Sequence, residues 1–405
     1  MKNLLLSTSL LLGFYSSTSA QTIAVSAETK QTIDTTQGHT TIGGYGNAYF
    51  QRDNNEEKAK MNFERLVLFT GHKFNKKFSF FSELEVEDAK VSGGEEGGEV
   101  ALEQCYIQYN VNATNYWKFG LFIPQIGLLN QNHLPENFNG NERSIVETIV
   151  IPSTWRELGI SYIGEFSKVP VSYSIALMNG LSSANFEHGT GIRGGRFEGR
   201  DATGNNLALT GAIEYAYKKI KFQVSGYYGG SVGLSKREAD KLQLESGIFG
   251  SAVGLLEANF RYTTKNFSFK ALACTISIPK AASINRAYLN NTADLAYGGS
   301  VEAAYVICRT KELNSSAHLI GFARFEKLDL NADIPGNAFK DPTLDQQHLI
   351  IGLTYLPLNN LVFKFDVRIK NTGNPNPELA GPPDPELPPY KSSNSFVNLG
   401  LGFSF

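Results

Sequence analysis

The sequence lacks a long hydrophobic run once its first 20 residues are set aside. A membrane-spanning helix needs about 18 consecutive apolar residues, and no later segment approaches that length. Hydrophobic residues make up only 41% of the chain, and the mean hydropathy is −0.21. If the chain crosses a membrane, it must do so as β-strands that satisfy one another's backbone hydrogen bonds.

Cysteine and net charge are also scarce. The three cysteines, Cys105, Cys274 and Cys308, show no CxxC or metal-ligand spacing, so a disulfide framework is not expected. The histidines form no HxxxH or HExxH pattern, and we predict no catalytic residues, no metal and no cofactor. A formal charge of −2 argues against nucleic acid as a partner.

Residues 1–20 have the pattern of an export signal. Lys2 is followed by an apolar stretch over residues 4–15, and small residues at 18–20 form a cleavage site before Gln21. A membrane-anchor helix is the alternative, but the run is short and the sequence after it is polar. We predict a signal peptide at 1–20 and a polar periplasmic lead-in at 21–38.

From residue 40 onward the dominant period of the sequence is two. In residues 361–370, Phe363 and Phe365 alternate with Lys364, Asp366 and Arg368. A half-buried strand of a soluble protein can show the same pattern. The apolar alternation that ends in a C-terminal Phe instead favours a barrel wall between lipid and water, with the charged side chains facing the water inside.

Connections between these segments alternate between short and long, and counting the segments gives about sixteen strands. We therefore predict an all-β fold: a transmembrane antiparallel β-barrel at residues 39–405, with long extracellular loops and short periplasmic turns. The polar faces of the strands supply the predicted pore-lining residues. These are Glu83, Glu85, Lys118, Lys221, Arg261, Lys270, Arg324, Lys364, Asp366 and Arg368.

The longest connection, residues 124–156, contains apolar residues that a solvated surface loop would not need. We expect it to fold into the barrel as a constriction; an ordinary surface loop is the alternative. Arg143 and Arg156 then have two possible roles. They either contact the solute near the narrowest point or pin the loop through Glu142 and Glu157.

The stretch from Lys118 to Phe166 resembles the central signature of the phosphate-selective porin family (O and P type). A second block around residues 178–196 is also similar. The residues that carry the resemblance are Gly120, Pro124, His133, Pro135, Glu142, Arg143, the run Pro152-Ser153-Thr154-Trp155-Arg156-Glu157, Gly159, the run MNGL at 178–181, Gly191-Ile192-Arg193 and Arg196. The likeness implies a sixteen-stranded outer-membrane porin that is usually trimeric.

On this basis we expect a porin in the outer membrane of a Gram-negative cell, through which small hydrophilic solutes or ions diffuse passively. Lipid and lipopolysaccharide would surround a homotrimer. The resemblance implies a preference for anions, phosphate among them. The mixed charges of the predicted lumen indicate only a weak preference with little phosphate specificity. The alternatives are a barrel enzyme and a structural or adhesive barrel with little conductance.

Overall fold

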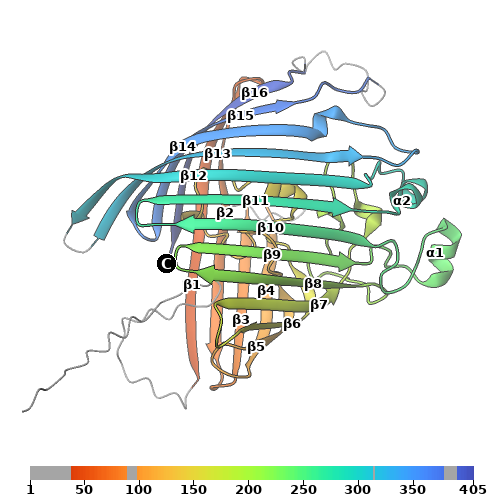
Figure 1. Ribbon diagram of the computed structural model, residues 1–405, viewed down its shortest axis with the longest axis horizontal. Helices are drawn as coiled ribbons and strands as arrows, with labels where there is room; N and C mark the ends of the chain where they lie inside the picture. The colour runs from red at the N-terminus through yellow and green to blue at the C-terminus, as the bar shows by residue number, and fades with distance from the viewer. Residues whose placement is uncertain (1–37, 89–97, 313–314, 378–389) are drawn as a thin grey trace, which may run out of the picture.

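A closed ring of sixteen antiparallel strands forms the protein, as predicted (Figure 1). The computed structural model describes residues 38–88, 98–312, 315–377 and 390–405. The expected signal peptide and all but the last residue of the expected lead-in lie outside them. The strands are β1 His39–Asp53, β2 Lys58–Lys73, β3 Phe78–Glu87, β4 Val100–Asn110, β5 Tyr116–Phe122, β6 Glu157–Glu165, β7 Val171–Asn179, β8 Leu207–Tyr217, β9 Ile220–Gly229, β10 Val253–Thr263, β11 Phe267–Ser277, β12 Leu295–Glu312, β13 Ser315–Asp333, β14 Asp345–Leu358, β15 Leu361–Thr372 and β16 Ser393–Ser404.

The outer wall is apolar and the inner wall is polar, because successive side chains of a strand point to opposite faces. On β15, Phe363 and Phe365 are exposed on the outside, whereas Lys364 and Asp366 are buried inside the ring. The neighbouring β14 repeats the pattern, with Ile351 exposed and Ile350 buried. This alternation is the signal that defined the strands in the sequence.

The barrel closes where its first and last strands pair. Gly44 and Phe405 exchange two backbone hydrogen bonds of 3.0 and 2.9 Å, and the pairing of β1 with β16 continues to Asp53 and Phe396. Gly44 is required by the close approach of β2, since a Cβ atom there would lie 2.6 Å from the Val67 carbonyl oxygen. Closure leaves the ring with no unpaired sheet edge.

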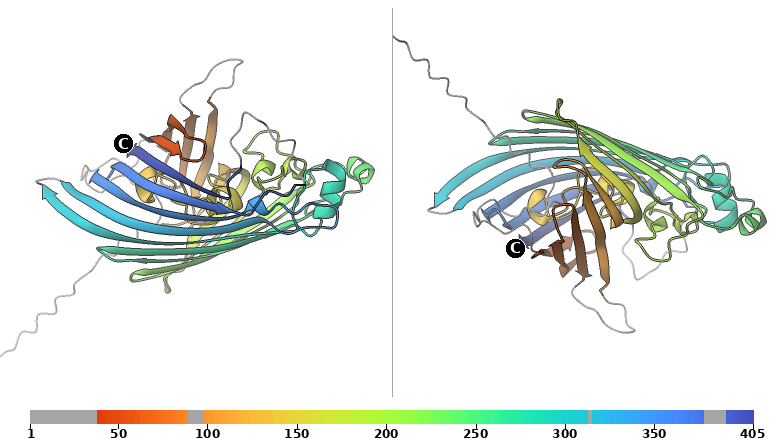
Figure 2. Two further views of the ribbon diagram at one scale, coloured as in Figure 1. Left: turned by 90° about the horizontal axis from the view of Figure 1, so that it is seen from above. Right: turned by 90° about the horizontal axis from the view of Figure 1, so that it is seen from below.

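The long connections gather at one end of the barrel and the C-terminus lies at the other (Figures 1 and 2). Two short helices, α1 Lys236–Leu242 and α2 Ala281–Tyr288, project at the long-connection end. Short helical turns lie in other connections: η1 Pro135–Asn137, η2 Val146–Val150, η3 Ser183–Asn185, η4 Arg193–Gly195 and η5 Pro342–Leu344. No helix among the described residues is long and apolar enough to cross a membrane.

A β-bulge interrupts the alternation in β4. Glu83 of β3 pairs with Gln104, and the next residue, Leu84, pairs with Leu102, so that Glu103 is an extra residue. A bulge of this kind redirects the side chain of the inserted residue. As a result, Glu103 and Gln104 are consecutive in sequence and yet both fully buried inside the ring.

The apolar outer wall gives a stability prediction for Ile351→Arg. Ile351 lies near the middle of β14 with 54% of its surface exposed. If this wall contacts lipid, a charge at mid-depth should cost about 2–4 kcal/mol of unfolding free energy. Urea titration of the barrel in lipid vesicles measures this, with Ile351→Leu as the control. Equal stability of the two variants would show that this face does not contact lipid.

Candidate functional site

The connection between β5 and β6, here called the inward loop (residues 124–156), folds into the ring of strands. The views in Figure 2 show its helical turn between opposite parts of the barrel. Ile126, Val146, Val150 and Ile151 of this loop are buried in one cluster with inward side chains of the wall, among them Leu272 of β11. Burial against the wall explains why a long loop carries so many apolar residues.

Polar contacts fix the inward loop to β13. Arg324 donates hydrogen bonds to the carbonyl oxygens of Asn139 (3.1 Å) and Glu142 (3.2 Å). The Glu326 carboxylate accepts from the Ser144 hydroxyl and from the backbone N–H of Val146, both at 2.9 Å. Each wall charge is thereby matched by groups that the loop would otherwise leave without partners.

The three charged residues of β15 are held in the same way. Lys364, Asp366 and Arg368 point inward, as the register predicts, but they are only 6%, 1% and 8% exposed. Their partners are the ring of Phe138 (3.6 Å), the backbone N–H of Asn141 (2.6 Å) and the Glu142 carboxylate (2.7 Å). We expected them to face water, and the structure corrects this: the inward loop covers them.

The wall formed by β2–β5 is equally covered. Glu83 accepts a 2.7 Å hydrogen bond from Gln104, and Glu85 pairs with Arg65 at 3.1 Å. The Lys118 ammonium lies 4.4 Å from the centre of the Tyr106 ring. Glu83, Glu85 and Lys118 are all at least nine-tenths buried. These inward charges therefore contact protein groups and not an open lumen.

Arg143 and Arg156 do not have the partners that we expected. Arg156 pairs with Glu198 at 3.0 Å, and Arg143 donates a 3.5 Å hydrogen bond to the carbonyl oxygen of His133. Of the expected carboxylates, Glu142 pairs with Arg368, and Glu157 accepts from Asn179 at 2.7 Å and from Trp155 at 3.3 Å. In this arrangement both arginines contact the loops that fill this part of the barrel.

Three cationic side chains on β9, β10 and β11 are not covered by the inward loop and remain accessible. Arg261 of β10 is directly opposite Lys221 of β9 and Lys270 of β11, so the three form a row across adjacent strands. Their side chains are 14%, 28% and 31% exposed, respectively. Glu214 pairs with Lys221 (3.5 Å) and Arg261, and Glu302 pairs with Lys270 (3.5 Å) and with Arg324 (3.5 Å). We call the accessible cations Lys221, Arg261 and Lys270 the basic row.

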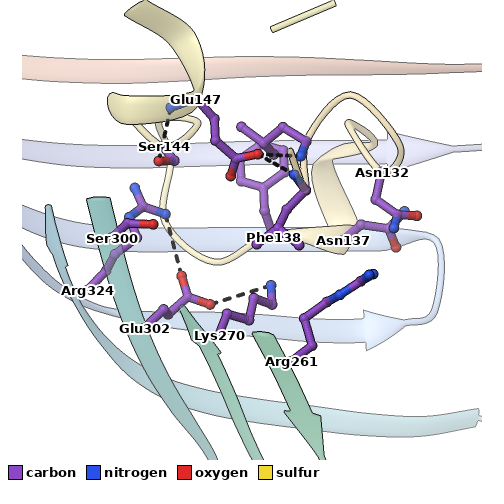
Figure 3. A pocket seen from close by; sticks show the side chains of 12 residues that line it. Asn132, Asn137, Phe138, Ser144, Glu147, Arg261, Lys270, Ser300, Glu302 and Arg324 are labelled. Atoms are coloured by element: carbon purple, nitrogen blue, oxygen red, sulfur yellow. Dashed lines mark hydrogen bonds and ion pairs between the residues drawn. The ribbon is translucent and has the colours of Figure 1, made fainter. Parts of the chain in front are cut away.

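Two cavities adjoin the basic row. One, of about 130 Å³, lies between the inward loop and β10–β13 (Figure 3). The other, of about 250 Å³, reaches Thr114 in the short turn after β4 and Glu165 at the end of β6. Asn132 and Arg261 line both cavities. The two cavities therefore adjoin at these two residues, one near the short-turn end and one beside the inward loop.

Burial also changes the protonation of two groups in the inward loop. The His133 imidazole is buried, and burial lowers its pKa to about 4, although the nearby Glu103 opposes this change. Burial raises the pKa of the Glu147 carboxyl to about 7 despite hydrogen bonds from the N–H groups of Leu129 and Leu128. His133 is therefore neutral near pH 7, and Glu147 titrates there.

Glu103 was absent from the predicted site residues. It is fully buried, accepts a 3.2 Å hydrogen bond from the Tyr45 hydroxyl, and lies 4.0 Å from His133 Nε2. Simple alternation misses it, because the bulge that turns it inward depends on the pairing of β3 with β4. The only signal in the sequence is the break in alternation at Leu102-Glu103-Gln104.

The fold is a closed sixteen-stranded antiparallel barrel, and solved structures similar to it share this fold. The chain is similar to the outer-membrane channel DcaP of Acinetobacter baumannii, with a TM-score of 0.55, 14% identity, and coverage of 91% of this chain and 98% of that one. It is also similar to OmpF of Salmonella typhi, with a TM-score of 0.55 and 12% identity, and the match covers 90% of this chain and 97% of that one. A third similar structure is an anion-selective porin from Comamonas acidovorans, with a TM-score of 0.53 and 10% identity, and the match covers 91% of this chain and 100% of that one. At these identities the likeness shows the fold.

In sequence, the chain is 26% identical over 337 residues to an uncharacterized protein of Aquifex aeolicus. The aligned region covers 80% of this chain and 74% of the Aquifex protein. No family profile matches the chain. The solved structures named above include an outer-membrane channel and an anion-selective porin, and a specific relation to the phosphate-selective family does not follow from them.

The raised pKa of Glu147 predicts how stability depends on pH. Since the folded state holds this proton up to about pH 7, against about 4.5 in the unfolded chain, stability should fall as pH rises between these values. A shift of this size corresponds to at most about 3 kcal/mol. Glu147→Gln should remove this part of the dependence, because its amide stays neutral.

Urea unfolding of the barrel at pH 5, 6, 7 and 8 measures this effect. The exposed Glu187 offers a matched control as Glu187→Gln, which should keep the pH dependence of the parent. If Glu147→Gln and the parent lose stability in parallel over this range, the Glu147 carboxyl does not titrate with a raised pKa.

Proposed function

We propose that this protein is an outer-membrane porin through which small hydrophilic solutes and ions diffuse passively, with a weak preference for anions. The observation that carries the proposal is the basic row beside the two adjoining cavities. Lys221, Arg261 and Lys270 are the accessible charges of the predicted lumen, whereas the other seven predicted residues are buried. In this proposal the two cavities belong to the conducting path, and a solute in them would lie beside the basic row.

The arrangement of charge supports a weak preference. The buried acidic residues Glu83 and Glu85 lie on β3, and the basic row is centred on β10, close to the opposite side of a ring of sixteen strands. The acidic side is already paired with protein groups, Glu85 with Arg65 and Glu83 with Gln104, so the partly neutralised basic row is the charge that a solute meets, and it concentrates anions only weakly.

Specificity for phosphate is not part of the proposal. Glu214 and Glu302 pair with members of the basic row and neutralise part of its charge. A strong phosphate site would need several unpaired donors that converge on one point. The basic row therefore supports attraction of anions in general. This is weaker than the phosphate preference that the family resemblance implies.

The inward loop is the proposed constriction. It packs against inward side chains from β9 to β16 and leaves the path beside the basic row. Arg143 and Arg156 would then act by fixing the loops and not by contacting the solute. We further propose export by the signal peptide, an outer-membrane location with surrounding lipid and lipopolysaccharide, and assembly as a homotrimer.

A second candidate is a structural barrel with little conductance. The observation in its favour is the extent to which the inward loop fills the interior, since the cavity in the middle of the barrel is only about 130 Å³.

Conductance in planar bilayers tests the proposal. The protein should form open channels, and the reversal potential in a potassium chloride gradient should show an anion preference. Arg261→Gln and Lys270→Gln should each reduce the chloride-to-potassium permeability ratio about two- to fivefold, because each removes a charge beside the path. Lys241→Gln on the exposed α1 helix removes the same charge elsewhere and should have no effect.

Three outcomes count against the proposal. Inserted, folded protein without conductance would support the structural barrel. A cation preference of the parent would contradict the role of the basic row. An unchanged permeability ratio in both Arg261→Gln and Lys270→Gln would place the conducting path elsewhere.

A further inference from the structure

Three side chains from separate parts of the chain converge behind the inward loop. They are Glu83 of β3, Glu103 on the bulge of β4 and His133 of the inward loop. One ligand atom from each lies within 4.8 Å of the other two, and His133 Nε2 is 4.0 Å from Glu103 Oε2. The residues are 5%, 0% and 3% exposed.

The hydrogen bonds at this cluster leave part of it without a partner. Gln104 donates to Glu83 Oε2 at 2.7 Å, and the Tyr45 hydroxyl donates to Glu103 Oε2 at 3.2 Å. The other oxygen of Glu103, Oε1, is fully buried and accepts no hydrogen bond from an amide, hydroxyl or guanidinium group, so that the Glu85 carboxyl, if protonated, or a bound cation would be its partner. A buried carboxylate oxygen in this state costs free energy, and a bound cation is one way to satisfy it.

We propose that Glu83, Glu103 and His133 bind a divalent transition-metal ion. One imidazole nitrogen and two carboxylate oxygens are ligands typical of zinc, and also suit manganese or iron. Two ligands of a tetrahedral zinc ion lie about 3.3 Å apart when each is about 2.0 Å from the metal. The present separations require only small side-chain rotations to reach that geometry, with the Tyr45 hydroxyl or a water as a further ligand.

The bulge in β4 is an independent argument for the site. Without the extra residue, the alternation of β4 could not place both Glu103 and Gln104 on the inner face. Glu103 is thereby directed toward His133. Gln104, its neighbour on β4, donates a hydrogen bond to Glu83 on β3 and so orients that carboxylate. Bulges that redirect a side chain are common at functional sites. A metal ligand supported by a hydrogen-bonding neighbour also has the usual form of a metal site.

The local charge favours a divalent cation. Five carboxylates, two of them in the cluster itself, and three cations lie in or around the cluster, which leaves an excess of two negative charges if all are ionised. They are Glu64, Glu83, Glu85, Glu87 and Glu103 with Arg65, Lys118 and Arg143. Arg65 is already engaged with Glu64 and Glu85, at 3.0 and 3.1 Å. Protonation of two carboxylates is the alternative way to remove this excess, and the experiment below distinguishes the two.

A metal here would fasten the inward loop to β3 and β4. The other polar contacts of the loop that we described lie on strands between β9 and β16, most of them on β13 and β15. The metal would therefore hold the loop across the lumen at both sides. The inference concerns binding and loop position, and it does not depend on whether the barrel conducts.

The test uses the mature full-length barrel in detergent, without a histidine tag, stripped with chelator and dialysed against zinc. Metal content should reach about one zinc per chain, and zinc should raise the unfolding temperature. His133→Gln and Glu103→Gln should each weaken zinc binding at least about tenfold, because each removes a ligand. The matched control is His348→Gln, which removes a buried histidine of β14 far along the ring and should bind zinc like the parent.

Two results would overturn the proposal. The first is stripped, folded parent protein that takes up no zinc, which would mean that protons neutralise the cluster. The second is binding that persists in both His133→Gln and Glu103→Gln. If either variant does not fold, as judged by heat-dependent gel migration, the parent loaded with cobalt gives the answer. X-ray absorption must then show an imidazole ligand, and its absence would equally refute the site. Bilayer conductance of the stripped parent tests the channel separately.

Discussion

Charges on the inner wall need partners, and on β13 and β15 the inward loop supplies many of them. Glu326 and Arg324 bond to its backbone and side chains, and Asp366 accepts one of its N–H groups. Without the loop these groups would need water, and without the wall the loop would leave its polar backbone groups and its apolar side chains exposed. The position of the loop and the charges of the wall are therefore fixed together.

This mutual dependence decides which charges remain available to a solute. Where the loop packs closely, as at Lys364 and Asp366, the charged groups act within the structure. Where it stands away from the wall, Lys221, Arg261 and Lys270 stay accessible. The same loop brings His133 beside Glu83 and Glu103. One segment thus shapes both the proposed path and the proposed metal site.

Much of the fold was predictable because a barrel wall between two media imposes a strict alternation on each strand. Residues 361–370 and the C-terminal strand showed it clearly, and the inward direction of Lys364, Asp366 and Arg368 followed from it. The apolar residues of 124–156 likewise predicted a loop that packs against something. The role of Glu103 was not predictable, because a bulge is a property of two paired strands and not of one segment.

The sequence by itself determined the β-barrel class, the approximate number of strands and the face on which the charged residues of a regular strand such as β15 lie, because these depend on local alternation and on the lengths of connections. Only the tertiary structure decided which inward charges are covered and which are open. That outcome depends on contacts between residues far apart in the chain, such as Glu142 with Arg368 or His133 with Glu103. The local sequence pattern does not predict such pairs, because the free energy that selects them arises only when the loop folds into the closed ring.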